Sequence, residues 1–478
     1  MPSPEDVRAL RTFVDAPVDR ALLGLVYGRR RIGKSTLLVA ESRARGGFYF
    51  EATRVETPVQ LERLGVALGD YLGVGRLALA DWGEALDRLL RLPVDGRPMV
   101  VLDEFGHVLE ADRSVESVLA GALGPGASDG RGSARLILCG SAISMMRALT
   151  AGQAPLRGRA GLELLMRPDD FRIAATRLPT PGDLALAATV FSVIGGVVGY
   201  ATDMTNFDLP ASADDFDRWV VERVLSPAAP LHYEATTLLA EDPVLAGASA
   251  LLHHGILGAI ANGSITAGSI AVKVARKVSN LAPALNRLVD AGFVVRHVDP
   301  LRQQRARYAL ADPYLQFHYA VLEPHRQVLR ARDRPGTWRE RLVGTFDARV
   351  RGPVFEEMAR EWVRKFADDA TLGGVPHHIG PSEAVVDGVR AELDVVVAGE
   401  GEVSGERTVL AIGEAKAGQT MGAGHLARLE RVRAALGTRA VGARLLLFGV
   451  AFTDPLVADG RRREDVELVD LDRLYEGR

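Results

Sequence analysis

The sequence predicts an α/β protein whose first third forms a parallel sheet with helices on both faces. Strand-like apolar runs recur in this part of the chain, among them LLGLVY, GFYFEA, VVLD and LILCG. Segments with helical periodicity lie between these runs, one starting at Lys34 and another over residues 60–72. Strands that alternate with helices favour parallel pairing, because the helices form the crossovers between the strands.

Size and composition fit a globular protein with several domains. The 478 residues leave room for about three cores, and the hydrophobic fraction of 47% and charged fraction of 25% are ordinary. A net charge of -3 argues against a surface coated in positive potential but allows local basic patches. Cys139 is the single cysteine, so no internal disulfide can form, and the N-terminus carries no export signal. We therefore expect a cytoplasmic protein.

One apolar segment, from Leu184 to Ala201, is long enough to cross a bilayer. Gly195 and Gly196 interrupt it, and no aromatic belt or basic flank frames it. We expect a buried helix followed by a tight turn there, and no membrane partner.

The chain divides into five segments. Residues 1–175 carry the alternating strands and helices, 176–243 form a mostly helical lid, and 244–325 form a compact helical region with one hairpin. Residues 326–351 form a junction that holds eight arginines and three acidic residues. A linker or exposed helix and a strip that contacts phosphates are both compatible with this composition. Residues 352–478 predict a second, smaller α/β domain.

The first functional motif is GRRRIGKS, which fits G-x-x-x-x-G-K-[ST] directly after the strand LLGLVY and at the start of a helix. Its glycines let backbone N–H groups wrap a β-phosphate. Lys34 can neutralise the β- and γ-phosphates, and Ser35 can offer its hydroxyl to Mg²⁺. We expect nucleotide contacts along the whole segment, which comprises Gly28, Arg29, Arg30, Arg31, Ile32, Gly33, Lys34, Ser35 and Thr36.

Two acidic residues end the apolar strand PMVVLDEF further along the chain. Asp103 at the strand tip can hold Mg²⁺ through water, and Glu104 is placed to polarise a water for attack on a γ-phosphate. The spacing from the first motif leaves a strand to insert between the two motif strands, which is typical of ATPases that use a catalytic glutamate. Ser141 ends the third strand and could sense the γ-phosphate or simply form a turn. Arg159 in PLRGRAG could reach the triphosphate from a loop.

The C-terminal third holds a second candidate site in a chain that has only five lysines. Asp394 lies at the start of one predicted strand, while Glu414 and Lys416 end the next. Strand alternation puts positions 414 and 416 on one face, with Asp394 alongside. Asp394 and Glu414 could bind a divalent metal while Lys416 orients or helps deprotonate water for phosphodiester cleavage, and Glu356 could add a further oxygen. A structural salt-bridge cluster is the alternative, but arginine would suffice for that.

Residues 249–319 predict three helices followed by a pair of strands, the helix-turn-helix variant known as a winged helix. Its third helix can lie in the major groove of DNA. Such a module can instead pack beside a nucleotide or bind a partner, and a solvated helix face is the simplest alternative. The candidate phosphate contacts are basic: Lys273, Arg276, Lys277 and Arg287.

The phrases YGRRRIGKSTLL, VVLDEF, CGSAISMM, PLRGR, VIGGVVGY and ADPYLQFHY together resemble the archaeal-type P-loop ATPase family, which is related to AAA+ and STAND ATPases. The resemblance runs through most of the chain. It implies a P-loop NTPase domain with an ASCE-type parallel sheet, a helical lid, a winged-helix module and a small C-terminal domain of restriction-endonuclease-like fold. The phrases ELD and EAK in that last domain resemble the PD-(D/E)XK nuclease motif.

The sequence therefore predicts an ATPase that uses ATP and Mg²⁺ and couples its nucleotide state to a winged helix and a nuclease-like domain. DNA or RNA would be contacted by these two parts and by the basic junction, and a homo-oligomer is compatible with this interpretation. Two alternatives stay open. One is a non-cleaving ATP-dependent signalling or assembly switch, and the other is a transcription regulator that acts through the winged helix.

Overall fold

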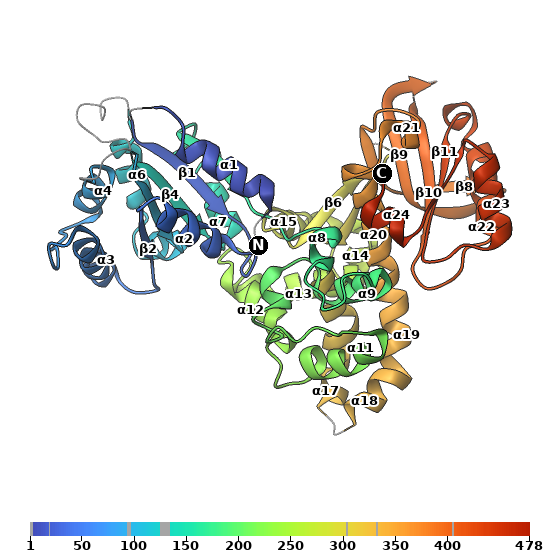
Figure 1. Cartoon of the computed structure of the whole chain (residues 1–478), viewed down its shortest axis with the longest axis horizontal. Coiled ribbons are helices and arrows are strands. Elements are labelled where there is room, and N and C mark those ends of the chain that lie inside the picture. Colours follow the sequence, from blue (N-terminus) through green and yellow to red (C-terminus); the bar gives the residue numbers. More distant parts are fainter. Residues whose placement is uncertain are drawn as a thin grey trace.

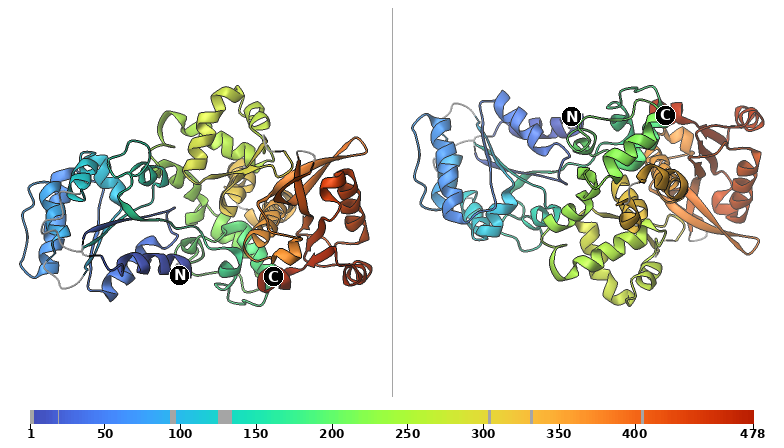
Figure 2. Two further views of the ribbon diagram at one scale, coloured as in Figure 1. Left: turned by 90° about the horizontal axis from the view of Figure 1, so that it is seen from above. Right: turned by 90° about the horizontal axis from the view of Figure 1, so that it is seen from below.

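The computed structural model describes residues 3–18, 20–92, 97–124, 134–302, 305–330, 333–403 and 406–478. An N-terminal α/β unit and a C-terminal α/β unit lie at opposite ends of the long axis (Figure 1). Helical segments from the middle of the chain lie between them, and the views from above and below show the same order (Figure 2).

The N-terminal sheet has five parallel strands in the order β2, β3, β4, β1, β5. Their bounds are β1 Leu22–Tyr27, β2 Phe48–Glu51, β3 Met99–Asp103, β4 Arg135–Gly140 and β5 Ala160–Leu165. The predicted parallel sheet is therefore confirmed. Strand β4 lies between β1 and β3, so the expected insertion between the two motif strands is also confirmed.

Helices cover both faces of this sheet because alternate strand residues point to opposite sides. Val101 and Ile137 face α1 (Pro4–Val14) and α2 (Lys34–Ala44). Leu102 and Leu138 face the other layer. That layer comprises α3 (Thr57–Leu72), α4 (Trp82–Leu90), α5 (Phe105–Ala111), α6 (Val115–Ala122) and α7 (Ile143–Ala148).

The apolar segment after the first unit is a buried helix and not a membrane span. Helix α9 (Leu184–Ile194) ends at Gly195, whose φ of 59° turns the chain toward the short α10 (Val198–Ala201). Along the stretches that the structure describes, every helix is too short or too polar to cross a bilayer. The predicted helix and turn are thus confirmed.

The centre of the molecule is helical, as predicted. After α8 (Phe171–Ala175) and α9 come α11 (Ala213–Val220), which continues as the π-helix η2 (Val221–Leu225), and α12 (Glu234–Glu241). Three helices follow, α13 (Ala250–Ala261), α14 (Ala267–Lys273) and α15 (Val278–Asp290), and then the antiparallel strands β6 (Val294–Val298) and β7 (Ala306–Leu310). The types and order of these elements agree with the prediction for residues 249–319; the name winged helix stays a prediction.

The predicted basic linker is mostly helical and continues into the C-terminal unit. After α16 (Pro313–Phe317), η5 (His318–Leu322) and α17 (Arg326–Leu329), the chain enters α18 (Arg334–Thr337). It then runs without a break through η7 (Trp338–Leu342), α19 (Val343–Phe346), η8 (Asp347–Arg351) and α20 (Gly352–Lys365). The expected boundary at residue 351 therefore falls inside one helix.

Sequence spacing explains this mixture of α and π turns. The buried side chains of the helix recur every four residues, at Trp338, Leu342, Phe346, Val350, Val354, Met358 and Trp362. A plain α-helix would rotate such a stripe away from the core, and the wider π turns bring it back. Pro353 lacks an N–H for Arg349 O, and Gln316 Nε2 donates to that carbonyl instead. Arg339, Arg341 and Arg349 of this helix are exposed.

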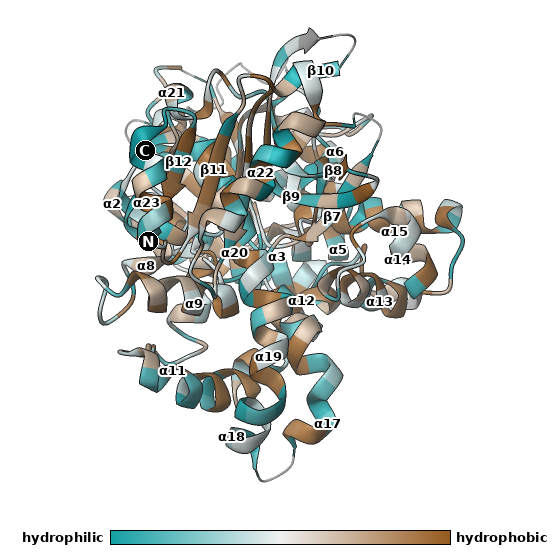
Figure 3. Ribbon diagram, turned by 90° about the vertical axis from the view of Figure 1, so that its right-hand side faces the viewer, coloured by the Kyte–Doolittle hydropathy of each residue, from teal (hydrophilic) through white to brown (hydrophobic). Residues whose placement is uncertain are grey.

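The C-terminal sheet is mixed, with strands in the order β12, β11, β10, β9, β8. The bounds are β8 His378–Val386, β9 Val389–Val403, β10 Glu406–Lys416, β11 Arg444–Gly449 and β12 Val466–Val469. Strands β8, β9 and β10 pair antiparallel, whereas β10, β11 and β12 are parallel. Helix α20 covers one face and α22 (Ala423–Ala435) the other, and β11 and β12 are strongly apolar between them (Figure 3).

Candidate functional site

The loop between β1 and α2 has the backbone of an anion cradle. Gly28, Arg31 and Gly33 have φ angles of 154°, 65° and 95°, which bend the loop around its own N–H groups. A Cβ at Gly28 would lie 2.4 Å from Met166 O, so only glycine fits there. Helix α2 begins at Lys34, and its first N–H groups have no partner inside the helix.

Lys34 and the end of β3 meet at this loop. Lys34 is 5% exposed, and its Nζ donates to Arg29 O at 2.9 Å, across the loop. Asp103 is buried and accepts from Tyr49 Oη at 2.6 Å. Burial opposes ionisation of Asp103, but hydrogen bonds from Cys139, Tyr49 and Ser35 outweigh it and lower the pKa of the carboxyl. Asp103 is therefore a carboxylate at neutral pH.

Glu104 and Ser141 meet at the carboxyl ends of β3 and β4. Glu104 adopts a left-handed backbone with φ of 49°, which is uncommon for a residue other than glycine. Ser141 Oγ donates to Glu104 Oε2 at 3.1 Å. Ser35 and Thr36 are exposed on the first turn of α2, whereas Ile32 is buried. The structure thus gathers the predicted loop, acids and serine at one edge of the sheet.

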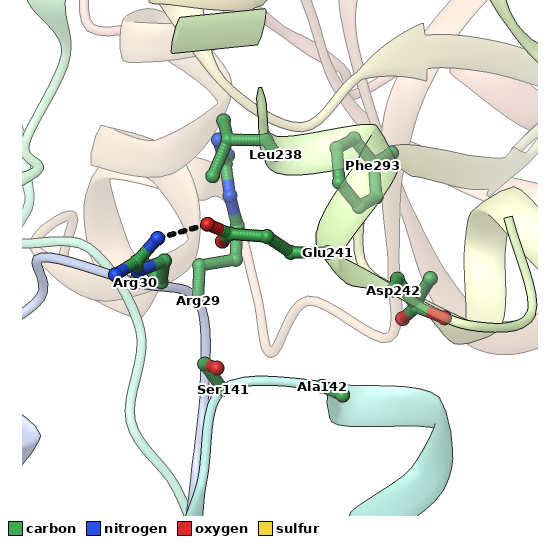
Figure 4. A pocket seen from close by; sticks show the side chains of 9 residues that line it. Arg29, Arg30, Ser141, Ala142, Leu238, Glu241, Asp242 and Phe293 are labelled. Carbon is green, nitrogen blue, oxygen red and sulfur yellow. Dashed lines mark hydrogen bonds and ion pairs between the residues drawn. The ribbon is translucent and has the colours of Figure 1, made fainter. Parts of the chain in front are cut away.

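The three arginines of the loop send their side chains to acidic residues from later segments. Arg29 is 7% exposed, and its Nη1 lies 2.7 Å from Asp312 Oδ2 in the ADPYLQFHY phrase. Arg31 Nε lies 3.1 Å from Glu234 Oε1. Arg30 pairs with Glu241, as the dashed line in Figure 4 marks. The expected nucleotide contacts of these residues stay a prediction; in the structure their three side chains are engaged in ion pairs with later segments.

Arg29 is the most buried of the three, and its surroundings favour the charged form. Burial lowers the pKa of its guanidinium, but the Asp312 carboxylate outweighs this and raises the pKa. The same guanidinium lies over the Phe293 ring, 5.4 Å from the centroid. A small cavity of about 20 Å³ remains between Arg30, Ser141 and Phe293 (Figure 4). It holds about one water molecule, so this side of the loop is closely packed.

Arg159 lies far from the phosphate loop. It immediately precedes β5, and Ala160 pairs with Leu23 near the start of the parallel strands β5 and β1. The loop follows the other end of β1, about five residues or roughly 16 Å away along the strand. The Arg159 guanidinium donates to Ala120 O at its own edge of the sheet. This placement contradicts the expectation that Arg159 reaches a triphosphate, and Arg157 lies in the same turn.

The C-terminal unit brings together the carboxylates and the lysine that the sequence groups. Lys416 Nζ is 3.4 Å from Asp394 Oδ2 and 3.3 Å from Glu414 Oε1. Ala415 N donates to Asp394 Oδ2 at 2.9 Å, which fixes that carboxylate against β10. Partial burial lowers the pKa of Lys416, but the two carboxylates outweigh it and raise the pKa above the usual lysine range. Lys416 is therefore an ammonium.

Glu356 on α20 lies beside this cluster. Burial, reinforced by the Asp394 carboxylate, raises the pKa of Glu356 to about 7, although 32% of its side chain remains exposed. Arg360, one turn further on, donates to Asp394 O at 2.7 Å and lies 3.8 Å from Glu356. Arg360 also donates to Glu357 at 2.7 Å. It thereby holds the backbone of Asp394 in place.

The carboxylates of this cluster are the type of ligand that a hard cation prefers, but they are not grouped so that they could hold one. Carboxylate oxygens are the ligands that Mg²⁺ and Ca²⁺ prefer. Over the described ranges, however, no three or more His, Cys, Asp or Glu side chains are grouped so that they could hold a metal ion. Cationic side chains engage the carboxylates instead. Arg428 Nη1 of α22 donates to Glu414 Oε2 at 3.0 Å, and the other Glu414 oxygen contacts Lys416.

Arg428 and the acids that hold the loop arginines are functional candidates that the sequence did not predict. Arg428 lies in a helix that no motif marks. Glu234 and Glu241 frame α12, and Asp312 is the N-cap of α16 in the ADPYLQFHY phrase; none of the three was predicted to contact the loop. The four predicted basic residues of that module, Lys273, Arg276, Lys277 and Arg287, are all exposed. No acidic residue lies between positions 267 and 289.

Comparisons with known proteins give distant likenesses. No family model matches the chain. The chain is 23% identical over 366 residues to the uncharacterized protein MJECL04 of Methanocaldococcus jannaschii, which covers 75% of this chain and 76% of the relative.

Solved structures give likenesses of the same kind. A Walker-type ATPase of Pyrococcus abyssi matches with a TM-score of 0.46 and 20% identity over 69% of this chain and 95% of its own. The ORC2 protein of Aeropyrum pernix matches with a TM-score of 0.41 and 18% identity over 68% and 93%. Likeness at this level assigns neither a fold nor an activity to this chain.

Proposed function

We propose that the N-terminal unit binds ATP and hydrolyses it. The observation that carries this proposal is the loop from Gly28 to Ser35, which bends through positive φ angles into the start of α2 while Lys34 lies across it. Such a loop presents a concave row of N–H donors to phosphate oxygens. A buried ammonium beside it neutralises the β- and γ-phosphates.

Mg²⁺ fits the residues beside the loop. Ser35 offers a hydroxyl oxygen and Asp103 a carboxylate oxygen, and Ser35 is one of the groups that lower the pKa of Asp103. Oxygen ligands of this kind are those that Mg²⁺ prefers. When bound, Mg²⁺ supplies positive charge that offsets the charge of the triphosphate.

Glu104 is the general base in this proposal. Its carboxylate lies beside the loop edge of the sheet, next to Asp103, and accepts from Ser141 Oγ at 3.1 Å. A carboxylate in this place can take a proton from a water that attacks the γ-phosphate. The Ser141 hydroxyl can turn from Glu104 to a γ-phosphate oxygen, so its hydrogen bond would differ between nucleotide states.

Phosphate release from ATP by the full chain tests this role. Glu104→Gln should bind ATP as the wild type does but lose at least about 100-fold in turnover, because an amide cannot accept the proton. Glu110→Gln is the matched control, since that glutamate lies in α5 and pairs with Arg54 away from the loop. Normal turnover by Glu104→Gln would rule out the assigned base.

The loop arginines offer a route from the nucleotide to the rest of the chain. Arg30 and Arg31 pair with the two ends of α12, and Arg29 with Asp312 at the start of α16. A loop that reshapes around a γ-phosphate would pull on these pairs, as γ-phosphate contacts order loops in other nucleotide switches. Nucleotide state would thereby reach the three-helix module.

The second candidate function is cleavage of nucleic acid by the C-terminal unit. The observation that favours it is the ammonium of Lys416, which lies between Asp394 and Glu414 at the end of β10, the central strand of the sheet. A divalent metal held by these carboxylates would polarise a scissile phosphate. Lys416 would hold its proton and orient a phosphate oxygen or the attacking water.

A cleavage assay on linear and circular DNA and on RNA, with Mg²⁺ or Mn²⁺, tests this second function. Lys416→Ala should abolish cutting while the fold is kept, and Lys365→Ala, an exposed lysine paired with Glu361, is the control. A wild type that cuts nothing in any nucleotide state would favour a non-cleaving signalling or assembly switch instead.

A transcription regulator is the remaining alternative. It is favoured by four exposed basic residues of α14, α15 and the turn between them, Lys273, Arg276, Lys277 and Arg287. Glutamine at these four positions should abolish salt-dependent DNA binding if the module acts on DNA. Binding by these residues in a chain that neither cuts nor turns over ATP would support the regulator.

A further inference from the structure

A groove between the β8–β9 hairpin and α22 adjoins the carboxylate–lysine cluster of the C-terminal unit. Its volume is about 580 Å³, within the roughly 300–1,000 Å³ of ligand sites. Val386 and Val389 of the hairpin and Val432 of the helix are its apolar lining residues. The groove is open to solvent, so a ligand can enter it from outside.

Arginines dominate the walls of this groove. Arg390 comes from the start of β9, and Arg428 and Arg431 come from α22. Of the two glutamates that also line the groove, Glu383 is neutralised from outside, because Arg302 and Arg305 both donate to its Oε1 at 2.7 Å. The net charge of the remaining lining residues is positive. A planar guanidinium group can donate two parallel hydrogen bonds to the oxygens of one phosphate.

Arg428 connects the groove to the cluster. Its Nη1 donates to Glu414 Oε2, and its Nη2 donates to Glu392 O on the wall of the groove. With Lys416 on its other oxygen, Glu414 is engaged on both sides by cations. A metal ion could use this carboxylate only after Arg428 had moved to another anion.

We propose that the groove binds a polynucleotide strand, and that a phosphate of this strand draws Arg428 from Glu414 and so frees that carboxylate for a divalent cation. This inference rests on the proposed second function, since it assigns the substrate path of that site. Metal binding and polynucleotide binding are then coupled, and each raises the affinity for the other by the same factor. Without bound polynucleotide, the ion pair between Arg428 and Glu414 thereby keeps the protein from binding the metal ion.

Binding of a fluorescent single-stranded oligonucleotide, measured by anisotropy in EDTA without nucleotide, tests the groove. Arg390→Gln/Arg431→Gln should bind the oligonucleotide at least about tenfold more weakly. Its affinity should also fall less steeply with salt concentration, by the equivalent of about two phosphate contacts. The matched control is Arg461→Gln/Arg462→Gln, which removes two exposed arginines of α23 (Asp454–Arg462) in the same unit. Equal affinity of the two double variants would overturn the groove as a strand site.

Calorimetric titration with Mn²⁺, again without nucleotide, tests the role of Arg428. Wild type should bind Mn²⁺ at least about tenfold more tightly when the oligonucleotide is present. Arg428→Gln should bind Mn²⁺ without oligonucleotide as tightly as wild type does with it. Weak Mn²⁺ binding by Arg428→Gln would overturn the coupling.

These results separate the inference from the function on which it rests. Suppose that cleavage depends on Lys416 but that oligonucleotide binding does not depend on Arg390 and Arg431. This result would support the nuclease function and rule out the groove as the strand-binding site. Groove-dependent binding and coupled Mn²⁺ uptake without any cleavage would keep the groove and reject the nuclease. The groove could instead join two copies of the chain. In that case the Arg390→Gln/Arg431→Gln variant would lose the dimer with no effect on oligonucleotide binding, and this result would also rule out the strand-binding site.

Discussion

Lys34 and Lys416 show at the level of single residues why this arginine-rich chain keeps a few lysines. Each ammonium lies among oxygens at close range, Lys34 on Arg29 O at 2.9 Å and Lys416 between two carboxylates. A compact ammonium with three rotatable donors can pass from these oxygens to those of a phosphate, whereas a planar guanidinium is fixed in its fork geometry. Both positions were predicted from the sequence because short motifs fix the neighbours of each lysine.

Two residues show why some positions could not be predicted from the sequence. Arg159 lies one residue before a strand, and its distance from the loop depends on which end of that strand faces the loop. Only the pairing of β5 with β1 decides this. Arg29 pairs with a residue 283 positions away, and no local pattern encodes such a contact.

His318 predicts a pH dependence of stability. Burial lowers its pKa from 6.5 to about 3, with smaller contributions from Arg326, His254 and His232. The carboxylate of Glu323, 3.7 Å away, does not offset this because it is paired with Arg326 at 2.6 Å. In the unfolded chain the histidine takes a proton near pH 6.5, so the folded state loses stability as the pH falls from 6.5 toward 3. The loss from this residue is about 2 kcal/mol at pH 5.

The measurement is the free energy of unfolding of wild type and His318→Phe at pH 8 and pH 5. The phenyl ring keeps the packing against Tyr314 and Tyr319 but cannot be protonated. The variant should lose about 2 kcal/mol less than wild type on acidification, and the exposed-site control His377→Phe should behave as wild type. Equal losses in His318→Phe and wild type would contradict the assignment.

At the level of elements, α16 is tied to the phosphate loop through its N-cap. Asp312 Oδ1 accepts from Tyr314 N at 2.8 Å, and Oδ2 pairs with Arg29 at 2.7 Å. Asn at this position keeps the cap but leaves a buried guanidinium without its counter-charge. Asp312→Asn should therefore lower the free energy of unfolding by about 3–5 kcal/mol, measured by denaturant titration.

Asp333→Asn is the matched control for this substitution. Asp333 caps α18 by accepting from Gly336 N at 2.9 Å, and it is exposed. Its replacement should change stability by less than about 0.5 kcal/mol. Similar small effects at both positions would show that the Arg29 pair does not stabilise the contact between loop and module.

Elements were predicted better than their connections. Strands β1 to β4, α9 with its glycine turn and the three helices with a strand pair all follow from apolar periodicity and breakers in the sequence. Strand β5 was not predicted. The junction was harder, because arginine-rich composition fits a linker as well as a helix. The four-residue stripe from Trp338 to Trp362 is the signal that could have identified a long helix with π turns.

At the scale of the whole molecule, the C-terminal unit is attached to the rest of the chain at two further places. In the turn between β6 and β7, Asp299 accepts from Ser382 Oγ of β8 at 2.5 Å. Helix α24 (Leu471–Glu476) returns to α8, where Tyr475 and Phe171 meet edge to face at 5.1 Å. Movement of the three-helix module would carry the C-terminal sheet with it, so a nucleotide signal at the first unit has a physical path to Lys416.

Nucleotide binding at the loop that contains Lys34 is the central requirement of the proposed function. Calorimetric titration of the full chain with ATP and Mg²⁺ is the most direct test. Wild type should bind one ATP per chain, and Lys34→Ala should bind at least about 100-fold more weakly, because about 3 kcal/mol of phosphate neutralisation is lost. Unchanged ATP affinity in Lys34→Ala would contradict the account.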